Sequence, residues 1–476
     1  MCETLSGMGA SKYDLIVIGS GPAGEKGAAQ AAYFGKKVAL VEKAAALGGA
    51  AANTGTLPSK TLRETALYLS GFRQRGLHGV TFGLADQVTA RDFLFHQQNV
   101  TGTERARIQA NLERHYVDQY PGFATFTDPH TISVVEDGNA AVPLTADFFL
   151  IATGSRPHRP GNFPFQDARV YDSDTILAIR DIPKTMLIAG GGVIGCEYAC
   201  LFQALGVEVT LVEGRDRLLQ FLDGEISQAL AASMAKMGIR LLLNESIEGV
   251  EPGSALNIKL KSGKTANVDT LLAAAGRSGN TDGMNLENVG VKPSSRGQIE
   301  VNAHYQTAAA HIYAAGDVIG FPALASTSME QARVAMVHAF DLKYKTAVAP
   351  ILPYGIYTIP ECSVAGETEE SLQKANIPYV AGRARYDQNP RGRIIGDRDG
   401  FLKLLFREDD MRLLGVSVIG EQATELIHVG LTALLQGSSA DLFIQMCFNY
   451  PTLSELYKYA AYDALGAKAR RRGRPD

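Results

Sequence analysis

Apolar and polar positions along the chain follow two periods. Short apolar runs, such as those at 15–18 and 148–151, stop abruptly at glycine-containing turns and predict buried strands of a parallel sheet. Stretches of helical period lie between and after them, and the clearest cover 423–436 and 452–465. Strands that alternate with helices predict an α/β fold, and 476 residues suffice for about three domains.

The strongest local pattern lies at 13–43. Gly19, Gly21 and Gly24 follow an apolar strand at G-x-G-x-x-G spacing, and a small-residue helix and a second strand ending at Glu42 come next. The first glycine permits a tight turn, the second lets a pyrophosphate approach the backbone, and the third lets the helix pack on the strand. The helix N-terminus supplies amide donors, and the acid accepts hydrogen bonds from an adenosine ribose. The pattern predicts a dinucleotide site.

The same pattern recurs at 184–219. Gly190, Gly192 and Gly195 precede a strand that ends at Glu213. The first glycine and the acid are 23 residues apart in both units, from 19 to 42 and from 190 to 213. Because chance rarely repeats such a distance, the chain is expected to bind two dinucleotides.

Three further strands are predicted to complete these units. The segments 148–157 and 270–280 each end an apolar run in a glycine turn, at Gly154 and Gly276. Another apolar strand is followed directly by Asp317. Ligands of open α/β sheets lie off the carboxyl ends of the strands, so Asp317 either contacts a cofactor or caps a helix.

Charge, hydrophobicity and cysteine content exclude several classes of partner and location. A net charge of -4 with 20% charged residues gives no electrostatic reason to expect a nucleic-acid partner, and the basic end at 468–476 is interpreted as a solvated terminus. Neither a membrane-spanning apolar run nor a secretory signal is expected. The five cysteines have no metal-ligand or Cys-x-x-Cys spacing, which predicts a reducing, cytoplasmic location and no metal site: Cys2, Cys196, Cys200, Cys362 and Cys447. Cys196 and Cys200 are expected to pack on one buried helix face.

Motifs in a fixed order carry a family resemblance. The two glycine units, the run "GGAAANTGTLPSK" at 48–60, "ATGSRP", "GD" at 316–317 and "YPTLSE" together resemble the flavoprotein disulfide reductases, which include lipoamide dehydrogenase and glutathione reductase. The resemblance implies FAD on the first unit, at Gly19, Gly21, Gly24, Glu42 and Asp317. It implies a nicotinamide dinucleotide on the second unit, at Gly190, Gly192, Gly195 and Glu213. It also implies that Lys60 lies near flavin N5 and pairs with Glu197.

The chain departs from this family where sulfur chemistry is expected. In the family frame of the 48–60 run two cysteines form the redox disulfide, and this chain has Ala51 and Thr56 there. The family's C-terminal base is a histidine, and this chain has Tyr450, which is a poor base at neutral pH. Glu455, which matches the acid that orients that base, remains. Thr56 is also interpreted as the N-cap of a helix that begins near Pro58.

Without the disulfide, a reduced flavin must pass its electrons to an outside acceptor. The phrases "GTLPSKTLRE", "DVIGFPALAS" and "FNYPTLSE" are most similar to the soluble, FAD-containing pyridine nucleotide transhydrogenases, a branch of the family. The resemblance implies hydride transfer between NAD(H) and NADP(H) through FAD. Lys60 and Glu197 are expected to tune the flavin, with Tyr450 and Glu455 shaping the facing wall.

The choice of nucleotide stays open at this point. Glu213 suits the free 2'-hydroxyl of NAD and repels the 2'-phosphate of NADP. Arg215 and Arg217 either bind that phosphate or are ordinary exposed loop arginines. In the second case the protein is an NADH-dependent reductase of a quinone, dye or oxygen. A third hypothesis is a flavoprotein that has lost catalysis and serves as a binding or electron-carrying subunit.

The resemblance also implies an architecture of two Rossmann-like dinucleotide-binding domains and a C-terminal α+β dimerisation domain. The expected division is an FAD domain at 1–155 and 277–350, an NAD(P) domain at 156–276 and an interface domain at 351–476. A homodimer is expected, and a higher homo-oligomer is left open. Within the last domain, strands are predicted at 401–406 and 413–420, and His428 is interpreted as packed on the apolar face of its helix.

Overall fold

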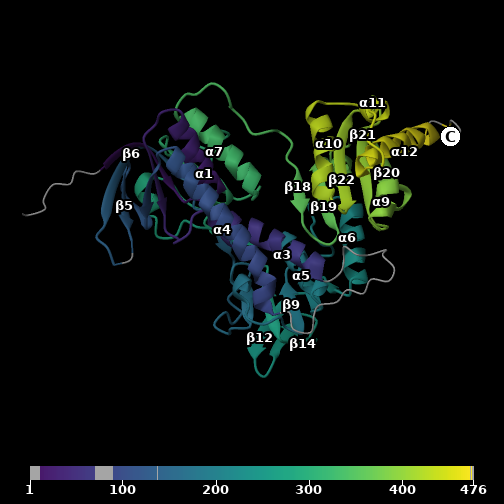
Figure 1. Cartoon of the computed structure of the whole chain (residues 1–476), viewed down its shortest axis with the longest axis horizontal. Helices are drawn as coiled ribbons and strands as arrows, with labels where there is room; N and C mark the ends of the chain where they lie inside the picture. The colour runs from purple at the N-terminus through teal and green to yellow at the C-terminus, as the bar shows by residue number, and fades with distance from the viewer. Residues whose placement is uncertain (1–10, 70–88, 137, 472, 474–476) are drawn as a thin grey trace, which may run out of the picture. The chain divides into compact units, whose positions relative to one another are not determined.

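The predicted apolar runs form parallel strands in two sheets, of which one is mixed and the other is fully parallel. Figure 1 shows the course of the chain, coloured from purple at the N-terminus to yellow at the C-terminus. The computed structural model describes residues 11–69, 89–136, 138–471 and 473, so Cys2 and part of the basic C-terminal run lie outside the described residues. The chain packs as two units. The first contains 1–61, 94–158 and 276–348, and the second contains 62–93, 159–275 and 349–476.

The first unit is built on one mixed sheet with helices packed on it. Its strands, in spatial order, are β3 (Asp118–Pro121), β2 (Val38–Glu42), β1 (Ser11–Ile18), β6 (Val142–Ile151), β5 (Thr131–Val135) and β4 (Phe123–Asp128), and β17 (Ile312–Ala314) also pairs with β6. The strands β1, β2, β3, β6 and β17 are parallel. Its helices include α1 (Pro22–Tyr33), which packs against α7 (Ala325–Ala339). The long helix α4 (Ala90–Arg114) also belongs mainly to this unit, although its first residues are assigned to the second unit.

Strand β1 is buried on both faces, as its unbroken apolar run predicts. Leu15 and Val17 join the core beneath α1 and α7, and Ile16 and Ile18 join the core on the opposite face. Successive side chains of a strand point to opposite faces, so one strand supplies both layers. This places the carboxyl end of β1 at the centre of the unit, where the first glycine turn follows.

The second unit contains a fully parallel sheet and an antiparallel one. The parallel strands, in spatial order, are β11 (Arg240–Leu243), β10 (Glu208–Glu213), β9 (Thr185–Ala189), β15 (Thr270–Ala273) and β8 (Val170–Asp172). The helices of this part are α5 (Val193–Ala204) and α6 (Gly224–Lys236), and a three-stranded meander follows in β12 (Ile247–Pro252), β13 (Leu256–Leu260) and β14 (Thr265–Val268).

The C-terminal part of the second unit is an antiparallel sheet with helices. Its strand order is β18 (Tyr354–Ile356), β19 (Glu361–Gly366), β22 (Leu413–Gly420), β21 (Phe401–Arg407) and β20 (Tyr379–Arg385). Helix α10 (Ala423–Leu435) packs on β22 and β19, and α12 (Leu456–Arg471) packs on β20 and β21. The predicted strands at 401–406 and 413–420 are confirmed, as are the predicted α/β class and its C-terminal α+β part.

Three local expectations need correction. Helix α3 (Thr56–Leu69) begins before Pro58, and the carbonyl of Gly55 accepts from the Ser59 amide, so Thr56 lies in the first turn and is not its N-cap. His428 is exposed, because it lies on the side of α10 opposite the buried Leu426. The predicted helix at 452–465 starts with a 3₁₀ turn at Leu453–Glu455 before α12.

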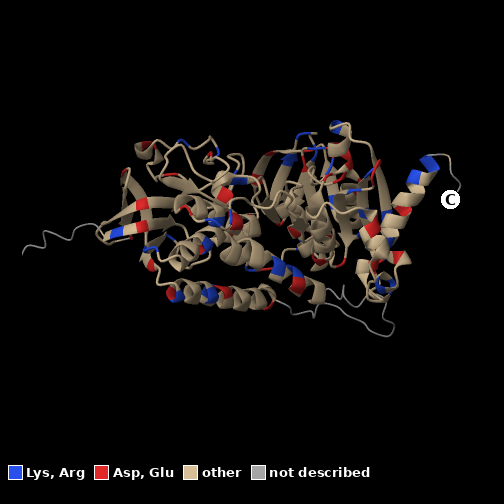
Figure 2. Cartoon of the chain, turned by 90° about the horizontal axis from the view of Figure 1, so that it is seen from above, with Lys and Arg blue, Asp and Glu red and all other residues tan. Residues whose placement is uncertain are grey.

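Charged residues of both signs are interspersed over both units (Figure 2). The last turn of α12 is a local exception and carries basic residues, namely Lys468, Arg470 and Arg471. Within the described ranges, no helix combines the length and apolarity that crossing a bilayer requires.

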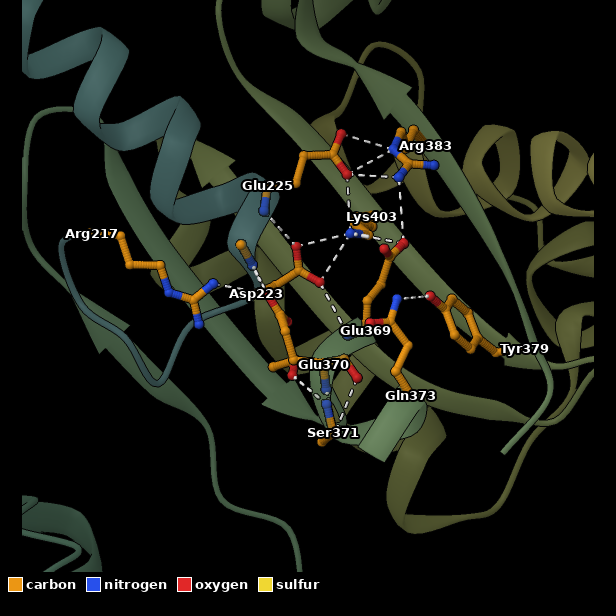
Figure 3. A network of polar contacts seen from close by, with 12 residues as sticks. Arg217, Asp223, Glu225, Glu369, Glu370, Ser371, Gln373, Tyr379, Arg383 and Lys403 are labelled. Carbon is orange, nitrogen blue, oxygen red and sulfur yellow. Dashed lines mark hydrogen bonds and ion pairs between the residues drawn. The ribbon is translucent and has the colours of Figure 1, made fainter. Parts of the chain in front are cut away.

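An ionic cluster around one buried lysine joins the parallel-sheet part of the second unit to its C-terminal sheet (Figure 3). Lys403 on β21 is 1% exposed, and its Nζ lies 2.8 Å and 2.9 Å from the two carboxylate oxygens of Asp223. Glu225 and Glu369 lie 3.0 Å and 3.1 Å from the same nitrogen, and Arg383 pairs with Glu225 at 2.7 Å. We call these five residues the Lys403 cluster. Asp223 also accepts from the Glu225 amide as the N-cap of α6.

The charges in this cluster stabilise each other against the cost of burial. Burial alone would lower the pKa of Lys403, but hydrogen bonds and charges from Asp223 and Glu225 raise it above 10.5. Burial likewise acts to raise the pKa of Glu225, and hydrogen bonds from Arg383 and Lys403 outweigh it and hold the pKa below 4.5. Of the five residues, only Lys403 and Asp223 are fully buried, so removing Lys403 would leave the carboxylate of Asp223 buried without its cation.

We predict that Lys403→Met lowers the free energy of unfolding by about 3 to 5 kcal/mol, because the carboxylate of Asp223 would stay buried without its cation. Urea denaturation followed by far-UV circular dichroism measures this, since the chain contains no tryptophan. Lys236→Met is the matched control, because Lys236 and Asp399 form a pair whose side chains are 70% and 55% exposed. Its loss should stay below about 1 kcal/mol. Equal losses for both variants would contradict a special role for the cluster.

The depressed pKa of Glu225 predicts a pH dependence with a definite sign. A carboxylate whose pKa is lower in the folded state stabilises the protein above its unfolded value of 4.5, and this contribution disappears as the pH falls through the folded pKa. The stability difference between the wild type and Glu225→Gln should therefore be constant near neutral pH and shrink below pH 4.5. Denaturation curves at several pH values measure it. Glu248→Gln, at an exposed pair with Lys259, is the control and should show no such step.

Candidate functional site

The first glycine turn is dictated partly by the protein's own packing. Gly19 has φ +103°, and a Cβ there would lie 2.4 Å from the Ala152 carbonyl oxygen. A Cβ on Gly24 would lie 1.8 Å from the carbonyl oxygen of Gly19. Any side chain at either position would collide with backbone, so these two glycines are required whether or not a ligand binds.

Gly21 differs from its two neighbours in the motif. A Cβ on Gly21 would come no closer than 3.9 Å to another atom, the Gly49 Cα, which is ordinary van der Waals contact. The fold itself therefore tolerates a side chain there. The missing side chain leaves the backbone at the start of α1 open to a ligand, as close approach of a pyrophosphate requires.

The second glycine turn repeats this geometry. Gly190 has φ +115°, and a Cβ would lie 2.4 Å from the Ala274 carbonyl oxygen. A Cβ on Gly195 would lie 1.8 Å from the Gly190 carbonyl oxygen, whereas a Cβ on Gly192 would meet no atom within 4 Å. In both turns the outer glycines serve the fold and the middle glycine keeps a space clear. The chain thus has two cradles suited to a dinucleotide.

The two predicted acids hold their glycine turns in the same way. Glu42 Oε2 accepts from the amide of Ser20 at 2.8 Å, and Glu213 Oε2 accepts from the amide of Gly191 at 2.6 Å. The second carboxylate oxygen accepts in each case from the amide two residues later, that of Ala44 at 2.8 Å and that of Arg215 at 3.0 Å. Both carboxylates are fixed beside the turn, at the place where an adenosine ribose is expected.

The 48–60 run lies against the first glycine turn. The Gly48 amide donates to Ser20 Oγ at 2.9 Å, and that hydroxyl donates to Glu42 at 2.6 Å. A Cβ on Gly49 would lie 2.8 Å from the Gly21 Cα, so only glycine fits this approach. Ala51 follows in the short helix α2 (Gly49–Asn53). The run therefore closes one side of the first cradle with backbone.

Asp317 lies just beyond the carboxyl end of β17, as expected for a cofactor contact. It accepts from Ser155 Oγ at 2.9 Å, and Arg277 Nε donates to the same hydroxyl at 2.7 Å. The N-cap of the 3₁₀ turn Asp317–Ile319 is Gly316, with no side-chain cap. The alternative role of Asp317 as a helix N-cap is thus not supported.

Gly154 and Gly276 both have positive φ and are both in the first unit. A Cβ on Gly154 would meet nothing within 4 Å. The Gly276 carbonyl accepts from the His158 amide at 2.9 Å, and here β7 (Ser155–Pro157) and β16 (Arg277–Gly279) form an antiparallel ribbon. The chain leaves the first unit and returns to it at this ribbon.

Sequence reasoning missed several residues at the first cradle. The Thr153 hydroxyl is buried and has no hydrogen-bond partner among the described residues, and its amide would lie 3.1 Å from a Cβ on Gly19. Such an orphaned hydroxyl beside the glycine turn fits a bound group. Ser20, Ser155 and Arg277 were also missed, because their signal is only a hydroxyl or guanidinium beside a predicted glycine.

Lys60 and Glu197 belong to different units. Lys60 is half-buried in the second turn of α3, and its Nζ donates to Ser59 Oγ at 3.3 Å. Glu197 is buried on α5 and accepts from the Tyr357 amide at 2.9 Å. Their predicted pairing stays a prediction.

The C-terminal positions Tyr450 and Glu455 have opposite environments. The Tyr450 side chain is 74% exposed, whereas Glu455 Oε2 is buried and has no hydrogen-bond partner among the described residues. The four described cysteines are all free, and three are fully buried, namely Cys196, Cys200 and Cys362. Burial raises the pKa of the Cys200 thiol to about 12, which fits the packed role predicted for this residue.

The family models agree with this geometry. Residues 13–339 match the model described as pyridine nucleotide-disulphide oxidoreductase, and residues 352–461 match the dimerisation domain of the same group. A soluble pyridine nucleotide transhydrogenase of Mycobacterium bovis is 46% identical over 95% of this chain and 97% of its own length. A protein of the same description from Chromohalobacter salexigens is 41% identical over 96% of this chain and 99% of its own.

Solved structures show the same fold. The HOCl-induced flavoprotein disulfide reductase RclA from Escherichia coli has a TM-score of 0.85 and 26% identity, covering 94% of this chain and 99% of its own. LpdA from Mycobacterium tuberculosis has a TM-score of 0.87 and 25% identity, covering 95% of this chain and 99% of its own. The resemblance predicted from the glycine units and the 48–60 run is confirmed, and the chain belongs to the pyridine nucleotide-disulphide oxidoreductase family.

Proposed function

We propose that this chain is an FAD-dependent transhydrogenase that moves hydride between NADH or NADPH and NAD⁺ or NADP⁺ without a redox-active disulfide. The observation that carries the proposal is the pair of matched cradles, each kept open at its middle glycine, in a chain with Ala51 and Thr56 at the family's cysteine positions. Two dinucleotides without an intervening disulfide fit direct hydride exchange. The names of the relatives with 41% and 46% identity support the same reaction.

The residues of the first cradle suit FAD. Gly21 and the start of α1 would take the pyrophosphate, Glu42 the adenosine ribose, and Asp317 with Ser155 the ribityl chain. When bound there, FAD would supply the hydride carrier between two nicotinamides. The cation of Lys60 would stabilise negative charge on the flavin, and Glu197 would set the position of that cation.

The second cradle would bind the nicotinamide dinucleotides in turn. Gly192 leaves the start of α5 open to a pyrophosphate, and Glu213 would accept from the adenosine ribose. Because both nucleotides use one site, the reaction would proceed in two half-reactions. Binding in this cradle orients the nicotinamide, and the chemistry belongs to the cofactors.

We further propose a cytoplasmic homodimer, with FAD parts at 1–155 and 277–350, an NAD(P) part at 156–276 and an interface part at 351–476. The match of 352–461 to a dimerisation domain supports the dimer. The exposed Tyr450 and the buried Glu455 oxygen, which has no hydrogen-bond partner in the described part of the chain, support a role for this region in contacts that one subunit alone does not complete.

A second candidate function is an NAD(P)H-dependent reductase of a quinone, dye or oxygen. It is favoured by the fixed carboxylate of Glu213, which suits NADH and opposes a 2'-phosphate. The two candidates differ in the acceptor that reoxidises the reduced protein.

Anaerobic reduction by one nucleotide and reoxidation by the other tests the proposal. Either NADH or NADPH should bleach the flavin absorbance, and the opposite oxidised nucleotide should restore it faster than a quinone does. Faster reoxidation by the quinone would establish the second candidate. Failure of both reduced nucleotides to bleach the flavin would refute both functions and favour a protein without catalysis.

The two glycine types in the second cradle give a matched pair of variants. Gly192→Val should lower the rate of flavin reduction by NADH at least about tenfold, because the added side chain occupies the open space of the cradle. Its loss of stability should be about 1 kcal/mol, the cost of replacing the N-cap glycine of α5 by valine. Gly195→Val should lower the free energy of unfolding by more than about 3 kcal/mol, because its Cβ would collide with the Gly190 carbonyl. Stopped-flow absorbance and thermal unfolding measure the two effects. A destabilised Gly192→Val with normal reduction kinetics would contradict the assignment.

A further inference from the structure

Under the proposed function, the second cradle must accept a negatively charged 2'-phosphate beside the carboxylate of Glu213. A site that accepts NADP(H) must place a 2'-phosphate near the acid at the end of β10. Glu213 is 9% exposed, and both of its carboxylate oxygens are held by backbone amides of the cradle. Because this carboxylate is fixed, it cannot turn away from the phosphate. A nearby cation is needed to admit the phosphorylated nucleotide.

Two arginines follow Glu213 in the segment 214–223, and Arg217 is already engaged. Its Nη1 donates to Glu370 at 2.9 Å, and its Nη2 donates to the Gln220 carbonyl at 2.9 Å. The same Glu370 oxygen accepts from the Gly224 amide at 2.8 Å. Figure 3 shows Arg217 directed from its loop toward Glu370 and the Lys403 cluster.

Moving Arg217 to a ligand would disrupt this arrangement. Burial acts to raise the pKa of Glu370, and the hydrogen bond from Arg217 is the first of the contacts that outweigh it and lower the pKa. The other oxygen, Oε2, is buried without a hydrogen-bond partner among the described residues. Without Arg217, this carboxylate would lose its cation. Arg217 therefore fastens the segment to the C-terminal part of the unit.

Arg215, unlike Arg217, has a fixed backbone and a side chain that is not engaged by the described residues. Its amide donates to Glu213 Oε1 at 3.0 Å, and its carbonyl accepts from the Asn244 amide at 2.9 Å, so its backbone is fixed on both sides. Its side chain is exposed, and within the described ranges its guanidinium makes no hydrogen bond or ion pair with the protein. A fixed backbone with an uncommitted guanidinium, two residues after the ribose acid, fits recognition of a phosphate.

The segment is also tied to the glycine turn itself. The Leu219 amide donates to the Gly191 carbonyl at 3.2 Å, and the Gly191 amide donates to Glu213 at 2.6 Å. The backbone on both sides of Arg215 is thus anchored to the turn that would hold the pyrophosphate. We propose that Arg215 is the residue that recognises the 2'-phosphate of NADP(H), and that Arg217 is a positioning residue for the segment and does not touch the nucleotide.

Neighbouring acids limit how much Arg215 contributes. Asp216 is exposed and accepts from Gln220, and Glu245 accepts from the amides of Ser246 and Ser262. With Glu213, these carboxylates outnumber the one uncommitted guanidinium of the segment. A modest preference for the phosphorylated ligand, of about tenfold, is therefore expected from one charge-assisted contact.

The test is calorimetric titration of the flavin-loaded protein with adenosine 2',5'-bisphosphate and with 5'-AMP, which differ only in the 2'-phosphate. The wild type should bind the bisphosphate about tenfold more tightly than 5'-AMP. Arg215→Ala should abolish this ratio and leave the affinity for 5'-AMP within about twofold. Arg215→Lys should retain part of the ratio, because it keeps the positive charge.

Two control variants distinguish direct contact of Arg215 with the phosphate from two other effects, a shift of the 214–223 segment and a change in net charge. Arg217→Ala should weaken both ligands equally and keep their ratio, since it loosens the whole segment. Arg240→Ala removes an exposed charge from the start of β11, where Arg240 pairs with Thr210 of β10, three residues before Glu213. This variant should change neither affinity. Loss of the ratio in Arg217→Ala or in Arg240→Ala would overturn the proposal.

Two further results would also overturn it: an unchanged ratio in Arg215→Ala, or a wild type that binds the two ligands equally. The inference rests on the proposed function, because only that function requires NADP(H) to bind. The binding measurement itself does not depend on hydride transfer. A protein that binds the bisphosphate through Arg215 yet does not exchange hydride between nucleotides would refute the function and keep this assignment. If the protein does exchange hydride between nucleotides but Arg215→Ala keeps the affinity ratio, the function would stand and the assignment of Arg215 would be refuted.

Discussion

The hydrogen bond from a strand-end carboxylate to the glycine turn is the interaction on which both cradles depend. Glu42 and Glu213 each reach from the neighbouring strand to the amide that follows the first glycine. One carboxylate thereby sets the conformation of the turn and the position of its own charge. The outer glycines of each turn pack against backbone carbonyl oxygens beside it, and both units keep the same 23-residue distance from the first glycine to the acid.

The sequence predicted the parts of the fold that follow from local chemistry. An apolar run and a glycine turn specify a buried strand and its exit, so β1, β6, β9 and β15 and the turns after them were expected. The roles of the glycines were less evident. Only the three-dimensional neighbours show that Gly24 is required by packing and that Gly21 is not.

Other features could not be predicted, because they depend on contacts between distant segments. Asp223 and Lys403 are 180 residues apart, and a buried lysine has no local signature. The exposure of His428 was misjudged, because an apolar stretch of helix does not by itself reveal which side faces the sheet. The difference between Arg215 and Arg217 depends on Glu370, which lies 153 residues beyond Arg217.

The antiparallel ribbon of β7 and β16 has an evolutionary consequence. Since the His158 amide bonds the Gly276 carbonyl, the segment between them starts and finishes at neighbouring points, like a cassette on a short stem. Exchange of that cassette between relatives would cost little chain entropy at the stem. The cassette carries Arg217 and Asp223, which pair with Glu370 and Lys403 outside it. A recipient protein would need an acid and a lysine at these two positions to accept the cassette. Coenzyme preference is therefore expected to change by single substitutions near residue 215 more readily than by recombination of whole segments.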